Sequence, residues 1–297
     1  MNILIVGSKG FIGQHVYMFF SEKSDYECWG CDVINEEHNS QYFSIDKSNC
    51  DFNAVFAQQN FDCCINCSGA ANVSESIANP LQDFYLNVLN VGKILEAIRI
   101  HNNNCKFINL SSAAVYGNPQ HLPVLTSAAI EPVSPYGWHK FYAEQLCNEY
   151  NRFFHIQTLN LRIFSAFGPG LKKQLFWDWF QNSIGEKEAI LYGTGNESRD
   201  FIYIDDLVKV IWLATKAENF KHGVVNVGNG NEVFIKNAAE LFFGLLNKIF
   251  AFKKQGKKSD PLNWVADIEE IKSWGYKQTV GFKEGLLKYI EWAKESG

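Results

Sequence analysis

The chain has 297 residues, of which 46% are hydrophobic, and its formal net charge is −5. A chain of this length and composition buries a large core, as one or two closely packed domains. The acidic balance excludes the basic surface with which proteins bind nucleic acid, and no apolar run approaches the roughly 20 residues that cross a bilayer. The first residues lead into an apolar stretch without a charged leader. We therefore expect a cytoplasmic protein with neither nucleic-acid nor membrane partners.

Eight cysteines occur in the chain, and in a chain this long they do not form a disulfide framework. Cys63, Cys64 and Cys67 lie close together, but no histidine or second cysteine pair stands at the spacing of a zinc site. Free cysteine behaves as a small hydrophobic residue. The run around them therefore predicts a buried strand and no metal site.

The first half of the chain alternates short apolar runs with amphipathic segments. The expected strands are Ile3–Val6, Tyr26–Cys31, Tyr42–Asp46, Cys63–Asn66, Cys105–Leu110 and Ile156–Arg162, and the expected helices are Ile12–Ser21, Ala54–Gln59, Leu81–His101 and Tyr136–Phe154. Alternating buried strands and helices indicate a parallel sheet covered on both faces. Right-handed crossovers then give an α/β, doubly wound Rossmann fold.

The pattern changes after Arg162, where Gly168-Pro169-Gly170 interrupts the chain. The remaining expected elements are the helix Leu175–Ser183, the strand Glu188–Tyr192, the strand and helix within Ile202–Ala217, and the helices Ile235–Ile249, Ile268–Trp274 and Phe282–Lys294. We expect a Rossmann domain at 1–165 plus 198–222 and a smaller C-terminal α/β lobe at 166–197 plus 223–297. Within that lobe, the basic run at 253–258 fits either a solvated loop or an anion-binding segment.

A glycine-rich loop follows the first strand, in the run Gly7-Ser8-Lys9-Gly10-Phe11-Ile12-Gly13. The three glycines allow a tight turn, close approach of the backbone to pyrophosphate, and close packing of helix on strand. The helix after the loop adds unpaired N–H groups facing the phosphates. The sequence of strand, loop, helix and second strand therefore predicts a dinucleotide site.

Asp32 ends the second expected strand, about 20 residues beyond the loop, where a carboxylate accepts hydrogen bonds from the adenine ribose. That carboxylate would repel a 2′-phosphate, which favours NAD. Lys9 argues the other way, because it could meet a 2′-phosphate unless it is solvated or pairs with Asp32. On balance we expect NAD rather than NADP, with Asp46 near the adenine.

Ser112, Tyr136 and Lys140 are the candidate catalytic residues. A tyrosine is a poor base near pH 7 because its ordinary pKa is about 10. A lysine one helical turn away places its ammonium on the same face and stabilises the phenolate. Ser112 ends an expected strand, where it could hydrogen-bond the reacting oxygen.

Together these residues resemble the extended short-chain dehydrogenase/reductase family, in particular its nucleotide-sugar epimerase/dehydratase group. The resemblance runs from Gly7 to about Tyr289. Its motifs are Ser112 with Val115-Tyr116-Gly117, Ser134-Pro135-Tyr136-Gly137-x-x-Lys140, and Gly193-x-Gly195 followed by Arg199-Asp200-Phe201-Ile202-Tyr203-Ile204-Asp205-Asp206. The resemblance implies that Asn87 and Lys140 contact the cofactor and that Arg199 binds the nucleotide diphosphate. It also implies a homodimer built through the helices Leu81–His101 and Tyr136–Phe154.

Departures from the family pattern bear on the reaction and the substrate. The acidic pair with which the dehydratases of the group eliminate water is replaced by Ala113 and Ala114. Ser165 stands where the family has an asparagine, and Lys257 stands where it has an arginine, whose fork geometry a lysine lacks. Trp264 stands where related epimerases set the size of the sugar pocket, and a bulky residue there would disfavour an N-acetylated sugar. The alternative interpretation is a tryptophan packed in the core.

These features predict an NAD-dependent 4-epimerase of a nucleoside-diphosphate hexose that works through a transient 4-keto intermediate. Two alternatives remain open. One is an NAD(P)H-dependent reductase of a nucleotide 4-keto-6-deoxysugar, and the other is a non-catalytic NAD-binding sensor. The sugar and the nucleotide base are not specified by the sequence.

Overall fold

The computed structural model describes residues 1–36, 38–184, 188–217, 223–253 and 262–296. Within them, seven parallel strands form a sheet in the order β11-β6-β5-β4-β1-β2-β3. The strands are β1 (Asn2–Val6), β2 (Glu27–Asp32), β3 (Tyr42–Ser44), β4 (Cys63–Asn66), β5 (Lys106–Ser112), β6 (Thr158–Ile163) and β11 (Gly223–Val227). This architecture confirms the predicted doubly wound α/β fold.

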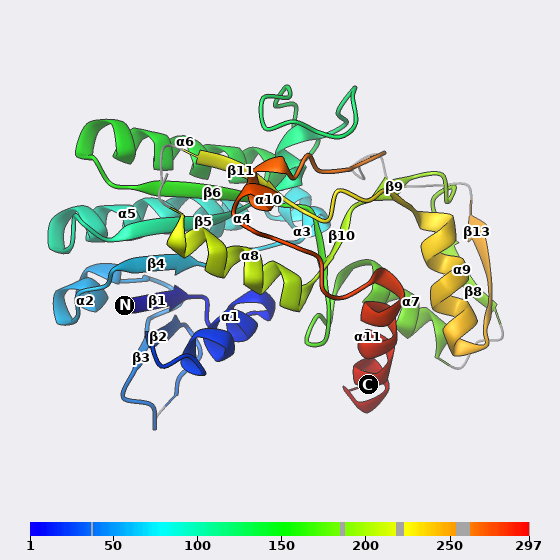
Figure 1. Cartoon of the computed structure of the whole chain (residues 1–297), viewed down its shortest axis with the longest axis horizontal. Coiled ribbons are helices and arrows are strands. Elements are labelled where there is room, and N and C mark those ends of the chain that lie inside the picture. The colour runs from blue at the N-terminus through cyan, green and yellow to red at the C-terminus, as the bar shows by residue number, and fades with distance from the viewer. Residues whose placement is uncertain (37, 185–187, 218–222, 254–261, 297) are drawn as a thin grey trace.

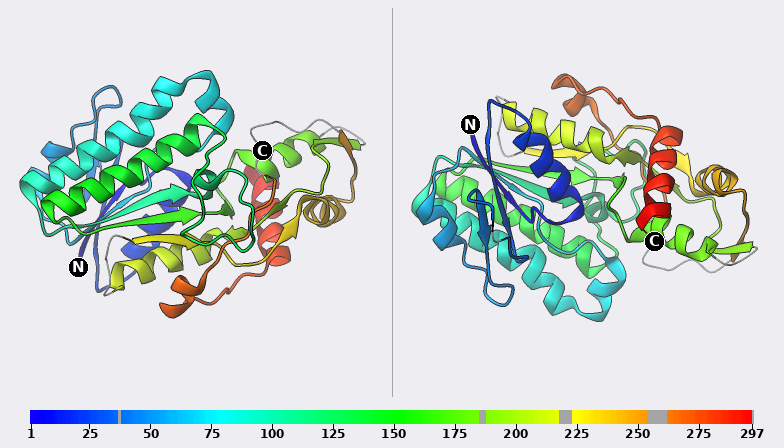
Figure 2. Two further views of the ribbon diagram at one scale, coloured as in Figure 1. Left: turned by 90° about the horizontal axis from the view of Figure 1, so that it is seen from above. Right: turned by 90° about the horizontal axis from the view of Figure 1, so that it is seen from below.

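Alternate residues of each strand face opposite sides of the sheet, and each side has its own helices. In β1, Leu4 and Val6 pack with α2 (Phe52–Gln58), α5 (Asn90–His101) and α6 (Pro135–Phe154). Ile3 and Ile5 pack instead with α1 (Phe11–Ser21) and α8 (Ile204–Lys216). The two further views of the ribbon show these helices on opposite faces (Figure 2). Burial on both faces explains why the central strands are continuous apolar runs.

The second lobe lies beyond the C-terminal edge of the sheet (Figure 1). Its helices are α7 (Gln174–Ser183), α9 (Ile235–Leu246) and α11 (Phe282–Ser296), and its strand pairs are β7 (Ser165–Phe167) with β10 (Phe201–Tyr203), β9 (Ser198–Arg199) with β12 (Val233–Phe234), and β8 (Glu188–Tyr192) with β13 (Ile249–Lys253). Phe176 of α7 lies at the centre of its core, within ring contact of Phe201, Phe242, Phe282 and Tyr289.

Short elements complete the chain. They are α3 (Val73–Ala78), α4 (Pro80–Phe84), the π-helical turn η1 (Tyr85–Leu89), the 3-10 turn η2 (Ala113–Tyr116) and α10 (Glu269–Ser273). The helix expected over Leu81–His101 is therefore divided, because η1 inserts a wider turn between α4 and α5.

Two other expectations were wrong. The helix expected over Ile235–Ile249 ends at Leu246, because Asn247 adopts a left-handed conformation (φ 53°) and Lys248 N–H donates to the Phe243 carbonyl. Residues 223–227 were assigned to the lobe, but as β11 they pair in parallel with β6 in the large sheet. Their short apolar run did not show which sheet they would join.

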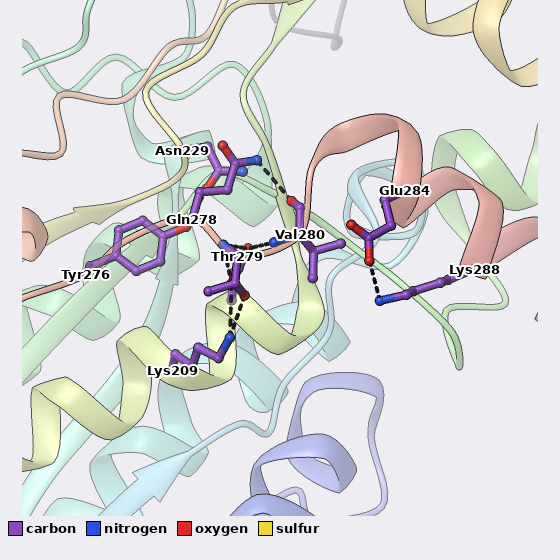
Figure 3. A network of polar contacts seen from close by, with 9 residues as sticks. Lys209, Asn229, Tyr276, Gln278, Thr279, Val280, Glu284 and Lys288 are labelled. Carbon is purple, nitrogen blue, oxygen red and sulfur yellow. Dashed lines mark hydrogen bonds and ion pairs between the residues drawn. The ribbon is translucent and has the colours of Figure 1, made fainter.

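A buried carboxylate ties the C-terminal segment to the Rossmann domain. Asp206, in the first turn of α8, accepts hydrogen bonds from the backbone N–H groups of Thr279 and Val280, at 3.0 Å each. Lys209, one turn further along α8, reaches the hydroxyl of Thr279 (Figure 3). The segment that leads into α11 is thereby fixed against α8.

No helix in the described ranges is both long and apolar enough to cross a membrane. In the same ranges, histidine, cysteine and acidic side chains do not gather in groups of three or more that could hold a metal ion. Seven of the eight cysteines are buried and Cys67 is half-buried, and none forms a disulfide. Cys63 and Cys64 lie in the buried strand β4, as predicted.

Candidate active site

The glycine-rich loop is packed too tightly for any side chain at two of its positions. Gly7 has φ +80°, and a Cβ there would lie 2.6 Å from the Ser68 nitrogen. A Cβ on Gly13 would lie 2.0 Å from the carbonyl oxygen of Gly7. Gly10 precedes α1, whose N-terminus has no side-chain cap, so its first N–H groups are available to an anion. The loop therefore has the form of a phosphate cradle.

Buried amide and hydroxyl groups around the loop lack partners within the described residues. Both polar atoms of the Asn87 amide and the Ser8 hydroxyl have no hydrogen-bond partner. Asn87 lies on η1 and its amide oxygen faces Gly69, which comes after β4. Such groups are costly to bury unless a ligand satisfies them. Together with the glycine cradle they fit a bound dinucleotide.

Asp32 is bound to the glycine-rich loop by a hydrogen bond from the loop backbone. Its carboxylate accepts hydrogen bonds from the N–H groups of Lys9 (2.9 Å) and Val33 (2.7 Å). The Lys9 ammonium pairs with Glu36 and not with Asp32, so it is already neutralised. Carboxylates at 32 and 36 thus surround the ribose end of the loop, which disfavours an additional phosphate. Asp46 is exposed beyond β3, where it accepts from Ser48.

Phe11 and Ile12 lie in the first turn of α1 and are half-buried. Phe11 meets His15 edge to face, and His15 in turn bonds the Pro169 carbonyl at 2.9 Å. The beginning of α1 is therefore held against the loop that leads into the second lobe. This places both residues beside the predicted cofactor site.

The three candidate catalytic residues come together at the carboxyl end of β5. Ser112 ends this strand and caps η2, where its hydroxyl accepts from the Ala114 N–H at 3.2 Å. Tyr136 lies in the first turn of α6, and its own N–H donates to the Ser76 hydroxyl at 3.1 Å. Lys140 donates to the Leu110 carbonyl at 3.0 Å, and its Nζ lies 5.9 Å from the Tyr136 ring centroid.

Burial shifts both ionisable groups of this cluster. It raises the pKa of Tyr136 to about 12, an effect that a hydrogen bond with Ser112 partly offsets. Burial lowers the pKa of Lys140 to about 8, against the stabilising charge of Asp83. Desolvation disfavours the charged form of each group, so both are poised to change protonation when another charge enters the site.

A buried ion pair links α6 to the sheet behind the candidate site. Glu144, one turn after Lys140, accepts from Arg162 Nε at 2.9 Å and Nη2 at 2.7 Å, and from the Ser111 hydroxyl at 2.5 Å. Arg162 also donates to the Tyr116 hydroxyl at 2.8 Å. These bonds connect β5, β6 and α6 behind the site. The sequence reasoning missed Glu144, although its spacing from Lys140 places both on one side of a helix.

The candidate substrate residues gather on the side of the second lobe. The guanidinium carbon of Arg199 lies 5.5 Å from the Trp264 ring centroid. The Trp264 indole donates to the Gly117 carbonyl at 2.9 Å, beside the turn that comes after Ser112. Ser165 N–H donates to the Asp200 carbonyl at 2.9 Å. Asp200 directly follows Arg199 in the chain, so Ser165 lies close to Arg199. Lys257, predicted to contact substrate, lies outside the described residues, as do 254–258 of the basic run.

Asp200 organises this side of the site, a role the sequence reasoning did not assign. Its buried carboxylate accepts from the N–H groups of Asn229 (2.8 Å), Gly230 (2.9 Å) and Ala266 (3.0 Å). Burial nevertheless raises its pKa. Hydrogen bonds to this one carboxylate thus hold together the segments that carry Arg199 and Trp264.

The sequence profile of the NAD dependent epimerase/dehydratase family matches residues 3–228. The chain belongs to this family. The match spans the glycine loop, the Ser112–Tyr136–Lys140 cluster and Arg199, and it confirms both the predicted resemblance and NAD as the cofactor.

Members of the family resemble the chain over its whole length. The protein CapI of Staphylococcus aureus is 27% identical over 338 residues, which cover 99% of each chain. The UDP-glucuronate 4-epimerase of Thermodesulfobacterium geofontis is 24% identical over 318 residues, 99% of this chain and 96% of the relative. A crystal structure of UDP-glucuronic acid 4-epimerase from Bacillus cereus, in complex with UDP-glucuronic acid and NAD, superposes with a TM-score of 0.91 at 26% identity and covers both chains completely.

Proposed function

We propose that this family member is an NAD-dependent 4-epimerase of a nucleoside-diphosphate hexose. The observation that carries the proposal is the cluster of Ser112, Tyr136 and Lys140 at the carboxyl end of β5, in which Tyr136 and Lys140 are buried and Ser112 is half-buried. Relatives named as UDP-sugar 4-epimerases match the chain from end to end. The cluster supplies acid–base groups where a cofactor and a sugar nucleotide would meet.

The residues present fit the cofactor well. Gly7, Gly10 and Gly13 would face its pyrophosphate, Asp32 its adenine ribose and Asn87 its nicotinamide half. When bound, NAD accepts a hydride from the sugar carbon and can return it to the opposite face. The chain's own contribution is to hold that ring, orient the sugar and move the proton.

Tyr136 takes the proton of the reacting sugar hydroxyl in this proposal, and Ser112 hydrogen-bonds the same oxygen. Burial holds the phenol protonated, so its activation needs positive charge close by. Lys140 provides that charge from one helical turn away, and its pKa of about 8 leaves it mainly protonated at neutral pH. Each unit by which the phenol pKa falls corresponds to about 1.4 kcal/mol of stabilised phenolate.

Dehydration is disfavoured by the two alanines that come directly after Ser112. Ala113 and Ala114 begin η2, and both are buried. Neither can transfer a proton, so a 6-hydroxyl would meet no acid or base at these positions. We therefore expect the 4-keto intermediate to be reduced back to an alcohol.

Arg199 and Trp264 would define the substrate side of the site. A guanidinium binds diphosphate with two parallel hydrogen bonds. Trp264 is fixed by its bond to Gly117 and by ring contact with Phe164. A bulky ring held in place leaves little room for an N-acetyl group, so we assign an unacetylated hexose or uronic acid to the pocket.

We also propose that the protein is a homodimer. Exposed apolar side chains line the helical segments α4–η1 and α6, which contact each other. They include Leu81, Tyr85 and Leu89 on the first segment and Trp138 and Tyr142 on the second. Leu81→Glu should give a monomer by light scattering, and a monomeric parent protein would contradict the proposal.

A direct test needs no added cofactor. The purified protein is incubated with UDP-glucose, UDP-glucuronate and their N-acetylated counterparts, and the products are separated as C4 isomers. We expect isomerisation of one unacetylated substrate and a loss of several orders of magnitude in Tyr136→Phe. Turnover that appears only when NAD(P)H is added, and that consumes it, would favour a reductase, and unchanged turnover in Tyr136→Phe would remove the mechanism.

A further inference from the structure

Asp83 of α4 and His139 of α6 form a buried pair that the proposed chemistry does not use. Asp83 Oδ2 lies 2.6 Å from His139 Nδ1. The residues are 3% and 8% exposed, respectively. An ionised carboxylate can only accept, so His139 Nδ1 is the donor. The second carboxylate oxygen, Oδ1, is buried with no hydrogen-bond partner among the described residues.

This pair lies directly against the catalytic helix turn. His139 comes three residues after Tyr136, so these two side chains are neighbours on α6, and Lys140 follows His139 directly in the chain. Phe84 packs edge to face on the imidazole, with the ring centroids 5.5 Å apart, and Tyr142 lies on its other side at 6.2 Å. Because Asp83 itself is only 3% exposed, solvent screens its charge little.

The Asp83 charge acts on both catalytic groups. It raises the pKa of Tyr136, because a nearby negative charge disfavours the phenolate. It also raises the pKa of Lys140, because the same charge favours the ammonium and so opposes the effect of burial. Of the charges that act on Lys140, that of Asp83 has the largest influence.

Three other titratable groups act on Lys140 besides Asp83. They are Cys67 after β4, Glu144 on α6 itself and Lys173 at the beginning of α7. The Glu144 charge is matched by the bidentate contact with Arg162. Among the described residues, Asp83 pairs with His139 and not with a lysine or arginine. Unlike the Glu144 charge, its negative charge is therefore not matched by a guanidinium and acts on the turn of α6 that carries Tyr136 and Lys140.

We propose that Asp83, held by His139, is a positioning residue that sets the pH range over which the Tyr136–Lys140 pair works. The role rests on the proposed function, because it assumes that this pair moves the proton. His139 holds the buried carboxylate in place through the contact of its Nδ1 with Oδ2. Asp83 in turn keeps Lys140 protonated and restrains Tyr136 from ionising too early.

The matching substitution is Asp83→Asn, which removes the charge and keeps the shape and a hydrogen bond to His139. Both Tyr136 and Lys140 should then lose their protons at lower pH. The bell-shaped pH profile of kcat should move as a whole to lower pH, by about one unit for a charge this close. His139→Leu should move it in the same direction, because it removes the partner that holds the carboxylate against the catalytic turn. His139→Asn retains a donor and should resemble the parent protein.

A second measurement monitors Tyr136 itself. Tyrosine labelled with ¹³C at the ring carbon bearing the hydroxyl reports ionisation by NMR, and Tyr136→Phe identifies the signal among the 12 tyrosines. The titration is run on NAD-saturated protein, parent and Asp83→Asn. Glu75→Gln serves as the control, because Glu75 is an exposed carboxylate on neighbouring α3 and should leave the titration unchanged.

The two readouts separate this inference from the proposed function. A Tyr136 signal that titrates at lower pH in Asp83→Asn supports the inference even if no sugar nucleotide turns over. A folded Asp83→Asn protein with an unchanged Tyr136 titration overturns it, whatever the turnover. A lower kcat at every pH with no shift of the profile would likewise overturn it, since that result indicates a structural role alone.

Discussion

Replacing Lys140 by methionine should make the cofactor-free protein more stable at neutral pH. The ammonium is buried, and its pKa falls from an ordinary value of 10.5 to about 8. A shift of this size corresponds to roughly 3 kcal/mol at about 1.4 kcal/mol per unit. The charge of Lys140 therefore destabilises the folded state by about that amount whenever both states are protonated.

Methionine fills a similar volume without a charge, but it leaves the Leu110 carbonyl without its donor. The lost hydrogen bond offsets about 1 kcal/mol of the gain, so we expect a net increase of about 2 kcal/mol at pH 7. The sign depends on pH. Between pH 8 and 10.5 the unfolded chain binds more protons at this residue than the folded protein does, so the parent protein gains stability as pH rises.

Urea unfolding of the cofactor-free protein at pH 7 and pH 10.5 measures the difference. The advantage of Lys140→Met should be present at pH 7 and largely gone at pH 10.5. Lys283→Met provides the control, because Lys283 is at the exposed beginning of α11 and should change stability little at either pH. A Lys140→Met protein less stable than the parent at pH 7, or a gain independent of pH, would refute the reasoning.

Three further substitutions test the frame around the site. Gly13→Ala should abolish co-purification of NAD, measured by absorbance of the denatured supernatant, because its Cβ would meet the Gly7 carbonyl at 2.0 Å; retained NAD would contradict the packing argument. Arg162→Met should lower the free energy of unfolding by about 3–5 kcal/mol, since it leaves Glu144 buried without its partner; the double variant with Glu144→Gln should recover part of that loss in urea. Arg199→Ala should raise the KM for the sugar nucleotide at least tenfold, the effect of losing about 1.4 kcal/mol of phosphate binding; an unchanged KM would show that the guanidinium does not contact the diphosphate.

Local signals in the sequence were sufficient for most of the Rossmann half. β4 was predicted from its apolar run and is buried at all four positions. The glycine loop was predicted because its spacing, preceding strand and succeeding helix occur together. The Tyr136–Lys140 spacing placed both residues on one helical face, and the structure has them there. In each case the signal lies within one element or at its junction with the next.

Features that depend on contacts between distant elements could not be predicted. Asp83 and His139 are 56 residues apart, and neither carries a local pattern that identifies the other. The π-helical turn around Asn87 adds a residue to one turn, which hydrophobic periodicity does not register. The contact between Arg199 and Trp264 likewise requires Asp200 to hold two segments together.

The order in which the strands are joined has a consequence for how the protein is made. β6 ends at Ile163, but its partner β11 begins only at Gly223, so the emerging chain carries an open sheet edge while the intervening lobe segment is synthesised. β8 must likewise wait for β13, and Phe176 can meet Phe282 only when the chain reaches the beginning of α11. Premature termination before Gly223 would thus leave an exposed strand edge and a bare aromatic cluster on an incomplete nucleotide-binding fold. We expect such fragments to require chaperones and to aggregate, not to accumulate as a smaller working domain.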